Sequence, residues 1–207
     1  LEVMDSELKY AYDECRRLAR KGPTSGIFGG RFTPGELRKH FCVVRAFARR
    51  SSDLAGTDRA AQWRSGLDAL PAGGASDPVL RALAATAKKF ILPIEPLRDM
   101  LDGAEADRAA RRVASSKDLL RLCRLTAAPQ GRILLLMHGH REASSLELSD
   151  KLFTAYRLTE ILLDLRRDLD RDRILLPQED FRAFGYSEAD LRMGVVNERF
   201  RNLMKQQ

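Results

Sequence analysis

Several features that mark large classes of protein are scarce or missing in this sequence. It holds three cysteines in 207 residues, and none of them forms a Cys-x-x-Cys pair. The longest uninterrupted apolar run, Ile133 to Met137, is far shorter than the roughly 20 residues that a membrane span needs. No N-terminal segment joins basic residues to a long apolar stretch, so we expect no secretory signal. We therefore expect Cys15, Cys42 and Cys123 to be buried free thiols in a reducing compartment.

Charge, by contrast, is plentiful and unbalanced. Lys and Arg number 36 against 29 Asp and Glu, which gives a formal net charge of +7. Arginine makes up most of the cations and suits bidentate contact with phosphate oxygens, so an anionic partner is indicated. A phosphorylated small molecule and an acidic membrane surface both fit. We expect no nucleic-acid partner, because aromatics are only 7% of the chain and the basic residues are spread over many predicted helices.

Apolar residues recur at helical spacing along almost the whole chain. Val, Ile and Thr never alternate over a useful length, so no strand is predicted. Thr33 with Glu36, and Ser115 with Asp118, are typical of capping boxes at helix starts. We predict one all-α domain spanning residues 1–207. Its helices are expected near 5–21, 33–55, 57–70, 77–90, 97–112, 119–139 and 149–170, after Pro177, and from Ser187 to Gln207.

The most informative segment runs from residue 158 to residue 173. It carries three acidic residues spaced four apart, which a helix would present as one stripe: Glu160, Asp164 and Asp168. Like charges at this spacing repel by roughly 0.2–0.5 kcal/mol per pair, so something should compensate them. A divalent cation such as Mg²⁺ would do so. So would three arginines one turn away, and the spacing alone favours an ordinary solvated face: Arg157, Arg167 and Arg171.

A second candidate segment lies near the end of the second predicted helix. Arg45, Arg49 and Asp53 share one face of that helix. This pattern is typical of an ordinary helix end, and less often of an arginine patch that contacts phosphate. His138 and His140 flank a glycine with no third ligand nearby, so no metal site is predicted there.

Taken in order, several segments resemble the squalene/phytoene synthase family, and the resemblance covers nearly the whole chain. Ala46-Phe-Ala-Arg49 is similar to the Ala-Phe-x-Arg that precedes the family's first aspartate motif. Residues 101–107 resemble its middle acidic segment, and residues 123–132 resemble its Cys-x-x-Ser-Ala-Asn-Pro-Val-Gly-Arg segment. Residues 158–185 resemble the second aspartate motif and its Arg-Ile-Tyr-Leu-Pro-x-Glu-Asp sequel. The hopanoid-pathway squalene synthase branch, which acts on presqualene diphosphate, is the most similar.

The resemblance implies an all-helical class I isoprenoid synthase fold, in which two aspartate-rich helices face each other across an apolar cavity. It also implies Mg²⁺ ions that bind the diphosphate of a prenyl substrate, farnesyl or presqualene diphosphate, and help it to leave. The catalytic residues implied for this chain are Asp164, Asp168 and Arg49. The implied metal ligands are Asp164, Asp168 and Glu160. The implied substrate-binding residues are Arg45, Arg49, Asp53, Arg157 and Arg167.

The chain departs from the family pattern at several positions. The two aspartates of the first motif are Ser52 and Gly56 here, which implies weakened or absent Mg²⁺ binding at that motif. Restoring both would lower the net charge from +7 to about +5, so part of the basic excess reflects this loss. The usual Asn of the second motif is Glu160, and residues 22–26 replace the family's His-Tyr-Glu-Asn-Phe-Pro segment. The family continues for several helices past the position of Gln207, so we expect C-terminal helices to be missing.

Two functions follow from the resemblance. The first is an enzyme of squalene or hopanoid biosynthesis that ionises a farnesyl-derived diphosphate with Mg²⁺. The second is a catalytically impaired relative that binds a prenyl diphosphate or acts as the partner of an active paralogous synthase. The loss of the first-motif aspartates at Ser52 and Gly56 favours the second. For either, we expect a cytoplasmic protein with peripheral contact at the inner membrane face, where a hydrocarbon product would leave.

Overall fold

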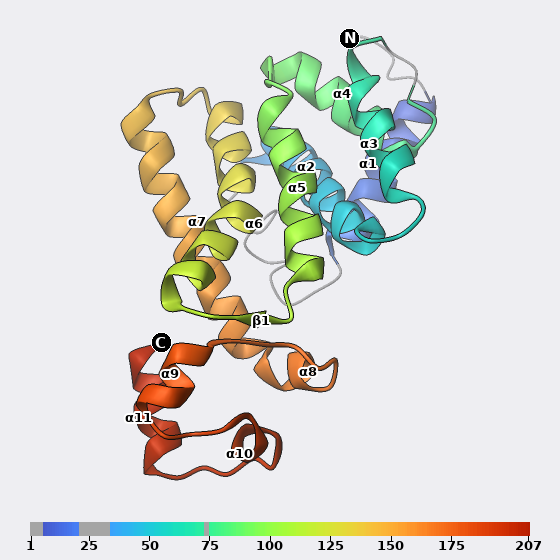
Figure 1. Cartoon of the computed structure of the whole chain (residues 1–207). Coiled ribbons are helices and arrows are strands. Elements are labelled where there is room, and N and C mark those ends of the chain that lie inside the picture. Colours follow the sequence, from blue (N-terminus) through green and yellow to red (C-terminus); the bar gives the residue numbers. More distant parts are fainter. Residues whose placement is uncertain (1–5, 21–33, 73–74) are drawn as a thin grey trace.

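The computed structural model describes residues 6–20, 34–72 and 75–207. Helices make up most of this part of the chain (Figure 1). They are α1 (Ser6–Ala19), α2 (Gly35–Leu54), α3 (Ala60–Asp68), α4 (Pro78–Phe90), α5 (Glu95–Ala109), α6 (Ser116–Met137), α7 (Ala143–Leu163), α8 (Leu165–Leu169), α9 (Gln178–Ala183), α10 (Glu188–Arg192) and α11 (Glu198–Gln206). A 3₁₀ turn covers Leu70–Ala72, and β1 (Arg112–Val113) pairs in parallel with β2 (Ile174–Pro177). None of the helices in the described ranges is long and apolar enough to cross a membrane.

Local sequence signals set two of the helix starts. The carboxylate of Asp77 accepts a hydrogen bond from the Val79 amide at 2.8 Å and so caps α4. The Ser115 hydroxyl accepts one from the Asp118 amide at 3.2 Å and caps α6. The predicted starts of both helices are confirmed. The predicted Thr33 cap lies outside the described residues.

Three predictions about secondary structure are wrong. The sequence predicts one helix over 149–170, but α7 begins at Ala143 and ends at Leu163, and Asp164 separates it from α8. The sequence predicts one helix from Ser187 to Gln207, but α10 ends at Arg192 and α11 begins at Glu198. Gly194 lies between them with a φ of +69°, a left-handed conformation through which a right-handed helix does not continue. The sequence also predicts no strand, whereas β1 and β2 pair in parallel. Strands this short carry too few residues to show an alternating pattern.

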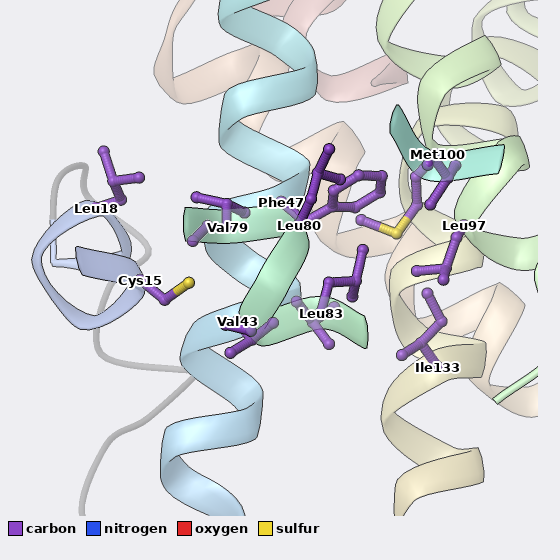
Figure 2. Close-up of a cluster of buried hydrophobic side chains, with 14 of the residues drawn as sticks. Cys15, Leu18, Val43, Phe47, Val79, Leu80, Leu83, Leu97, Met100 and Ile133 are labelled. Carbon is purple, nitrogen blue, oxygen red and sulfur yellow. The ribbon is translucent and has the colours of Figure 1, made fainter. Parts of the chain in front are cut away.

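The main core lies between α1, α2, α4, α5 and α6. Figure 2 shows its side chains pointing toward one another from these helices. Phe47, Leu83, Leu97 and Ile133 come from four different helices, and all are fully buried. Burying each such side chain contributes about 1.5–3 kcal/mol relative to leaving it exposed. Cys15 joins the same cluster, and all three cysteines are buried and free, as predicted.

A second apolar cluster holds the C-terminal helices together. Figure 1 shows α8 to α11 gathered at one end of the molecule, beyond the lower ends of α6 and α7. Strand β2 joins the two regions, because its side chains alternate between them. Ile174 and Leu176 pack with the C-terminal cluster, while Leu175 packs with Cys123 and Ile161 of α6 and α7. The segment after α7 is therefore fixed against the α6–α7 pair.

Two glycines let three neighbouring helices approach closely. A Cβ on Gly131 of α6 would overlap the Phe153 ring of α7 and lie 2.5 Å from the Ser149 hydroxyl oxygen. A Cβ on Gly103 of α5 would lie 2.6 Å from the backbone oxygen of Leu125 in α6. These contacts set the spacing of α5, α6 and α7, which form three walls of the cavity described next.

Candidate functional site

A cavity of about 450 Å³ lies where α2, α5, α6 and α7 meet. Its lining joins segments that are far apart in the chain, from the last turns of α2 to residues just after α8. Six of the site residues predicted from the sequence line this one cavity: Arg45, Arg49, Asp53, Arg157, Glu160 and Arg167. Both candidate segments of the sequence analysis therefore face the same space.

Helix α2 supplies a basic wall. Arg49 Nε lies 4.0 Å from the Asp53 carboxylate one turn later. Arg45 Nε donates a hydrogen bond to the Ala19 carbonyl at 3.0 Å, which ties this side chain to the end of α1. Burial is the strongest influence on the pKa of Arg45 and lowers it, and the neighbouring Arg49 acts in the same direction, against Tyr156 and Glu160. A guanidinium stays charged even so, and this wall is positive.

The end of α2 separates Ser52 and Gly56, the two positions that the family resemblance matches to aspartates of the first motif. Ser52 lies in the last turn of α2, is exposed and lines the cavity. Gly56 lies beyond the helix, which ends at Leu54, and has a φ of +69°. A side chain at Gly56 would be held in a left-handed conformation and would approach Arg108 at 3.4 Å. Position 56 therefore lies off the helix that carries Ser52.

Opposite α2, a network of ion pairs fixes the α7 wall. One oxygen of Asp107 in α5 accepts hydrogen bonds from Arg157 Nη2 at 2.7 Å and from Arg173 Nη2 at 2.8 Å. Burial is the strongest single influence on the pKa of Asp107 and raises it, but the two guanidinium groups together outweigh it, so the pKa is lowered. Arg157 also donates to Glu160 at 3.4 Å. Asp107 and Glu160 are therefore already occupied by cations of the chain itself.

The two aspartates predicted to be catalytic lie just outside the lining. Asp164 directly follows the last residue of α7 and is paired with Arg167. Asp168 is only 9% exposed, and its carboxylate lies 3.9 Å from Arg173 Nε. Burial raises the pKa of Asp168, with Arg173 opposing and Asp164 reinforcing the effect. With Arg157 beside Glu160, each carboxylate of the predicted acidic stripe has an arginine neighbour.

These neighbours bear directly on whether the site could hold Mg²⁺, which prefers several oxygen ligands in octahedral geometry. Within the described ranges, no three His, Cys, Asp or Glu side chains gather in a group that could hold a metal ion. His138 and His140 are both exposed. Residues 21–33 contain no residue of these four types. The residues present do not fit the metal cluster that the family resemblance implies.

A larger cavity, of about 870 Å³, opens on a different face of α6 and α7. None of the predicted site residues lines it. Its one buried charge, Asp150, is 3% exposed and accepts hydrogen bonds from Arg132 at 2.6 and 2.8 Å and from Arg124 at 3.2 Å. These bonds satisfy the carboxylate, so we take the smaller cavity as the candidate site.

Comparison with known proteins agrees with this geometry. A family model described as squalene/phytoene synthase matches residues 20–207. The chain belongs to the squalene/phytoene synthase family. It is 31% identical to the 15-cis-phytoene synthase of Synechococcus elongatus, over 97% of this chain and 71% of that protein.

Two solved structures of squalene/phytoene synthase relatives share the fold. The squalene synthase HpnC from Alicyclobacillus acidocaldarius matches with a TM-score of 0.86 and 30% identity, over 98% of this chain and 80% of that one. A dehydrosqualene synthase crystallised with a ligand matches with a TM-score of 0.85 and 27% identity, over 97% and 72%. The predicted all-helical isoprenoid synthase fold is confirmed. The squalene/phytoene synthase family belongs to isoprenoid biosynthesis, and its members typically use Mg²⁺.

Three polar residues that line the cavity were not predicted from the sequence: Thr126, Gln130 and Tyr156. Helical spacing could have found Tyr156, because it lies four residues before Glu160 and so shares its face. Thr126 and Gln130 are also four apart and lie together on α6. Nothing in the local sequence distinguishes their face of α6 from its neighbours.

Proposed function

We propose that this family member binds a farnesyl-derived diphosphate, either farnesyl or presqualene diphosphate, and breaks its carbon–oxygen bond during squalene or hopanoid biosynthesis. One observation carries the proposal: arginines of α2 and α7 meet across a single cavity. Arg45 and Arg49 line one wall, and Arg157 lines the opposite wall. Planar guanidinium groups match the oxygens of a diphosphate in geometry and charge. The likeness to the squalene synthase HpnC supports this choice of substrate class.

The cavity also offers apolar surface for a prenyl chain. Met100 and Phe153 line it beside the arginines. On α7, Leu152 and Leu148 lie one and two turns before Tyr156, so all three share one face of the helix. Leu148 is 66% exposed and Leu152 is 68% exposed. This apolar stripe runs away from the charged walls, as expected for a ligand with an anionic head and a hydrocarbon tail.

The reaction we propose is a heterolysis. The electron pair of the carbon–oxygen bond moves to the bridging oxygen, which leaves inorganic diphosphate and an allylic or cyclopropylcarbinyl cation. Arg45, Arg49 and Arg157 would stabilise the negative charge that grows on the leaving group. Met100 and Phe153 would shield the cation from water until the carbon skeleton has rearranged.

A second candidate function is favoured by the paired carboxylates. Glu160 and Asp164 are each bound to an arginine, and the first-motif position in α2 is Ser52. A protein with these features could bind a prenyl diphosphate without turnover, as the partner of an active paralogous synthase. In either role, the basic excess would favour peripheral contact with an acidic membrane surface.

The deciding experiment is incubation with farnesyl diphosphate and, separately, presqualene diphosphate, each with and without Mg²⁺. Released diphosphate and extracted hydrocarbon are measured together with equilibrium binding of each substrate. Release from either substrate supports the enzyme. Binding without release under every condition supports the non-catalytic role, and the absence of both binding and release would contradict both.

A further inference from the structure

We propose that the cavity between α2 and α7 holds the diphosphate group through arginine side chains and that this binding does not require Mg²⁺. The inference rests on the proposed prenyl-diphosphate ligand and concerns how its head group is held. Five arginines line the cavity: Arg45, Arg49, Arg157, Arg167 and Arg171. Three carboxylates line it: Asp53, Asp107 and Glu160. The lining is therefore formally positive before any metal enters.

The carboxylates are poorly placed to recruit a cation. Asp107 bonds to two arginines, and Glu160 lies 3.4 Å from Arg157. Asp53 is 57% exposed and stands 4.0 Å from Arg49. A Mg²⁺ ion brought to any of them would be repelled by the guanidinium group beside it. The arginines already supply the positive charge that a metal ion would bring to the diphosphate.

Some of these arginines remain accessible to a ligand. Arg49 keeps 39% of its side chain exposed, and Arg167 keeps 52%. Arg171 is exposed and makes no ion pair with any described residue. These three side chains reach the cavity from α2, from α8 and from the residues that follow α8. A diphosphate between them would gain charge-assisted hydrogen bonds from more than one direction.

Ser52 offers a direct way to change the metal requirement. It lines the same wall as Arg49 and Asp53, and it lies on regular helix. Ser52→Asp would add a carboxylate next to Asp53, which repels a diphosphate but provides a second oxygen ligand for Mg²⁺. The substitution should therefore weaken binding without metal and make binding respond to Mg²⁺.

The test is isothermal titration calorimetry with inorganic diphosphate and with farnesyl S-thiolodiphosphate, an unreactive analogue, in EDTA and in excess Mg²⁺. We expect the Kd of the analogue in EDTA to lie within about threefold of its Kd in Mg²⁺. This is less than the tenfold change that corresponds to about 1.4 kcal/mol of binding free energy. Arg49→Gln and Arg171→Gln should each weaken binding about tenfold or more in EDTA, because each removes hydrogen bonds to a charged group. Arg166→Gln is the matched control, since Arg166 is 79% exposed and lies outside the cavity. It should change Kd by less than about twofold.

The outcomes separate this inference from the function on which it rests. Binding of the analogue only in Mg²⁺ would overturn metal independence and leave the proposed ligand standing. Binding in EDTA that survives both arginine substitutions would show that the arginines do not form the head-group site. No binding in either buffer, by protein whose circular dichroism shows an intact helical fold, would overturn the proposed ligand as well. Binding in EDTA that depends on Arg49 and Arg171, and becomes Mg²⁺-dependent in Ser52→Asp, supports the inference.

Discussion

Replacing Asp107 with asparagine tests whether this single carboxylate holds the α5, α7 and β2 segments together. One oxygen of Asp107 accepts hydrogen bonds from both Arg157 and Arg173, at 2.7 and 2.8 Å. The side chains of Arg157 and Arg173 are only 19% and 14% exposed, so their charges depend on this anion more than on water. Asp107→Asn keeps the shape of the side chain and removes its charge.

The expected cost follows from the burial of the three groups. Removing one partner of a fully buried ion pair typically costs about 3–5 kcal/mol, because an uncompensated charge stays behind. Asp107 is 26% exposed, and Arg157 and Arg173 keep weaker contacts with Glu160 and Asp168 at 3.4 and 3.9 Å. We therefore expect a loss near the low end, about 3 kcal/mol. For a chain of this length this corresponds to a fall of about 6–12 °C in Tm.

The assay is urea unfolding followed by circular dichroism. Because the folded pKa of Asp107 is lowered, its stabilisation is present above the pKa of the unfolded chain, near 3.9, and is lost as the pH falls through the folded pKa. The difference between wild type and Asp107→Asn should be full at pH 7 and shrink below about pH 4. Asp102→Asn is the control, since Asp102 on the same helix is 55% exposed and should cost less than about 1 kcal/mol. A cost for Asp107→Asn no larger than that of the control would refute the reasoning.

Three further predictions concern packing, titration and capping. Gly131→Ala should cost about 2 kcal/mol in urea unfolding, because its methyl group overlaps Phe153, whereas Gly35→Ala, with nothing within 4 Å, should not destabilise the fold. His40 is buried, and burial lowers its pKa to about 4, so its stabilisation is complete above pH 6.5 and falls away toward pH 4 by about 3 kcal/mol. His40→Gln should flatten that part of the stability profile, and an unchanged profile would contradict the assignment. Asp77→Ala should cost about 1 kcal/mol by removing the cap of α4, measurable as a lower midpoint in urea.

The sequence could predict those parts of the fold that local signals determine. The starts of α4 and α6 follow from Asp77 and Ser115, whose side chains bond to backbone amides two and three residues away. The break between α10 and α11 at Gly194 was missed, because a single glycine within a helical pattern does not reveal the sign of its φ angle. The β1–β2 pair was missed because it joins Arg112 to Ile174, and no local pattern encodes such a contact.

The candidate site, like the fold, could be predicted from the sequence only where local spacing determines it. Residues that share a helical face could be predicted to lie together, and Arg45, Arg49 and Asp53 do line one wall. The arginine neighbours of Glu160 and Asp164 are two that the spacing offered, Arg157 and Arg167. The occupation of Asp107 and Asp168 could not be predicted. It depends on Arg173, which the β1–β2 pairing of Arg112 with Ile174 brings next to Asp107. The arginine neighbours of the acidic stripe are thus partly local, as for Glu160, and partly a product of the tertiary fold.

The backbone at Gly56 changes how any attempt to restore the first aspartate motif must be interpreted. The family resemblance matches both Ser52 and Gly56 to aspartates, so by sequence alone the two restorations look equivalent. In the structure only Ser52 lies on the helix and in the cavity lining, while Gly56 has a φ of +69° beyond the helix end. An aspartate at position 56 would occupy a left-handed conformation, which is unfavourable for residues other than glycine. It would join the helix only if α2 extended by about half a turn. A double restoration that gains no activity would therefore leave open whether the carboxylate ever reached the cavity. Ser52→Asp alone, with binding measured in the presence and absence of Mg²⁺, adds a carboxylate to the cavity wall and requires no change in the backbone.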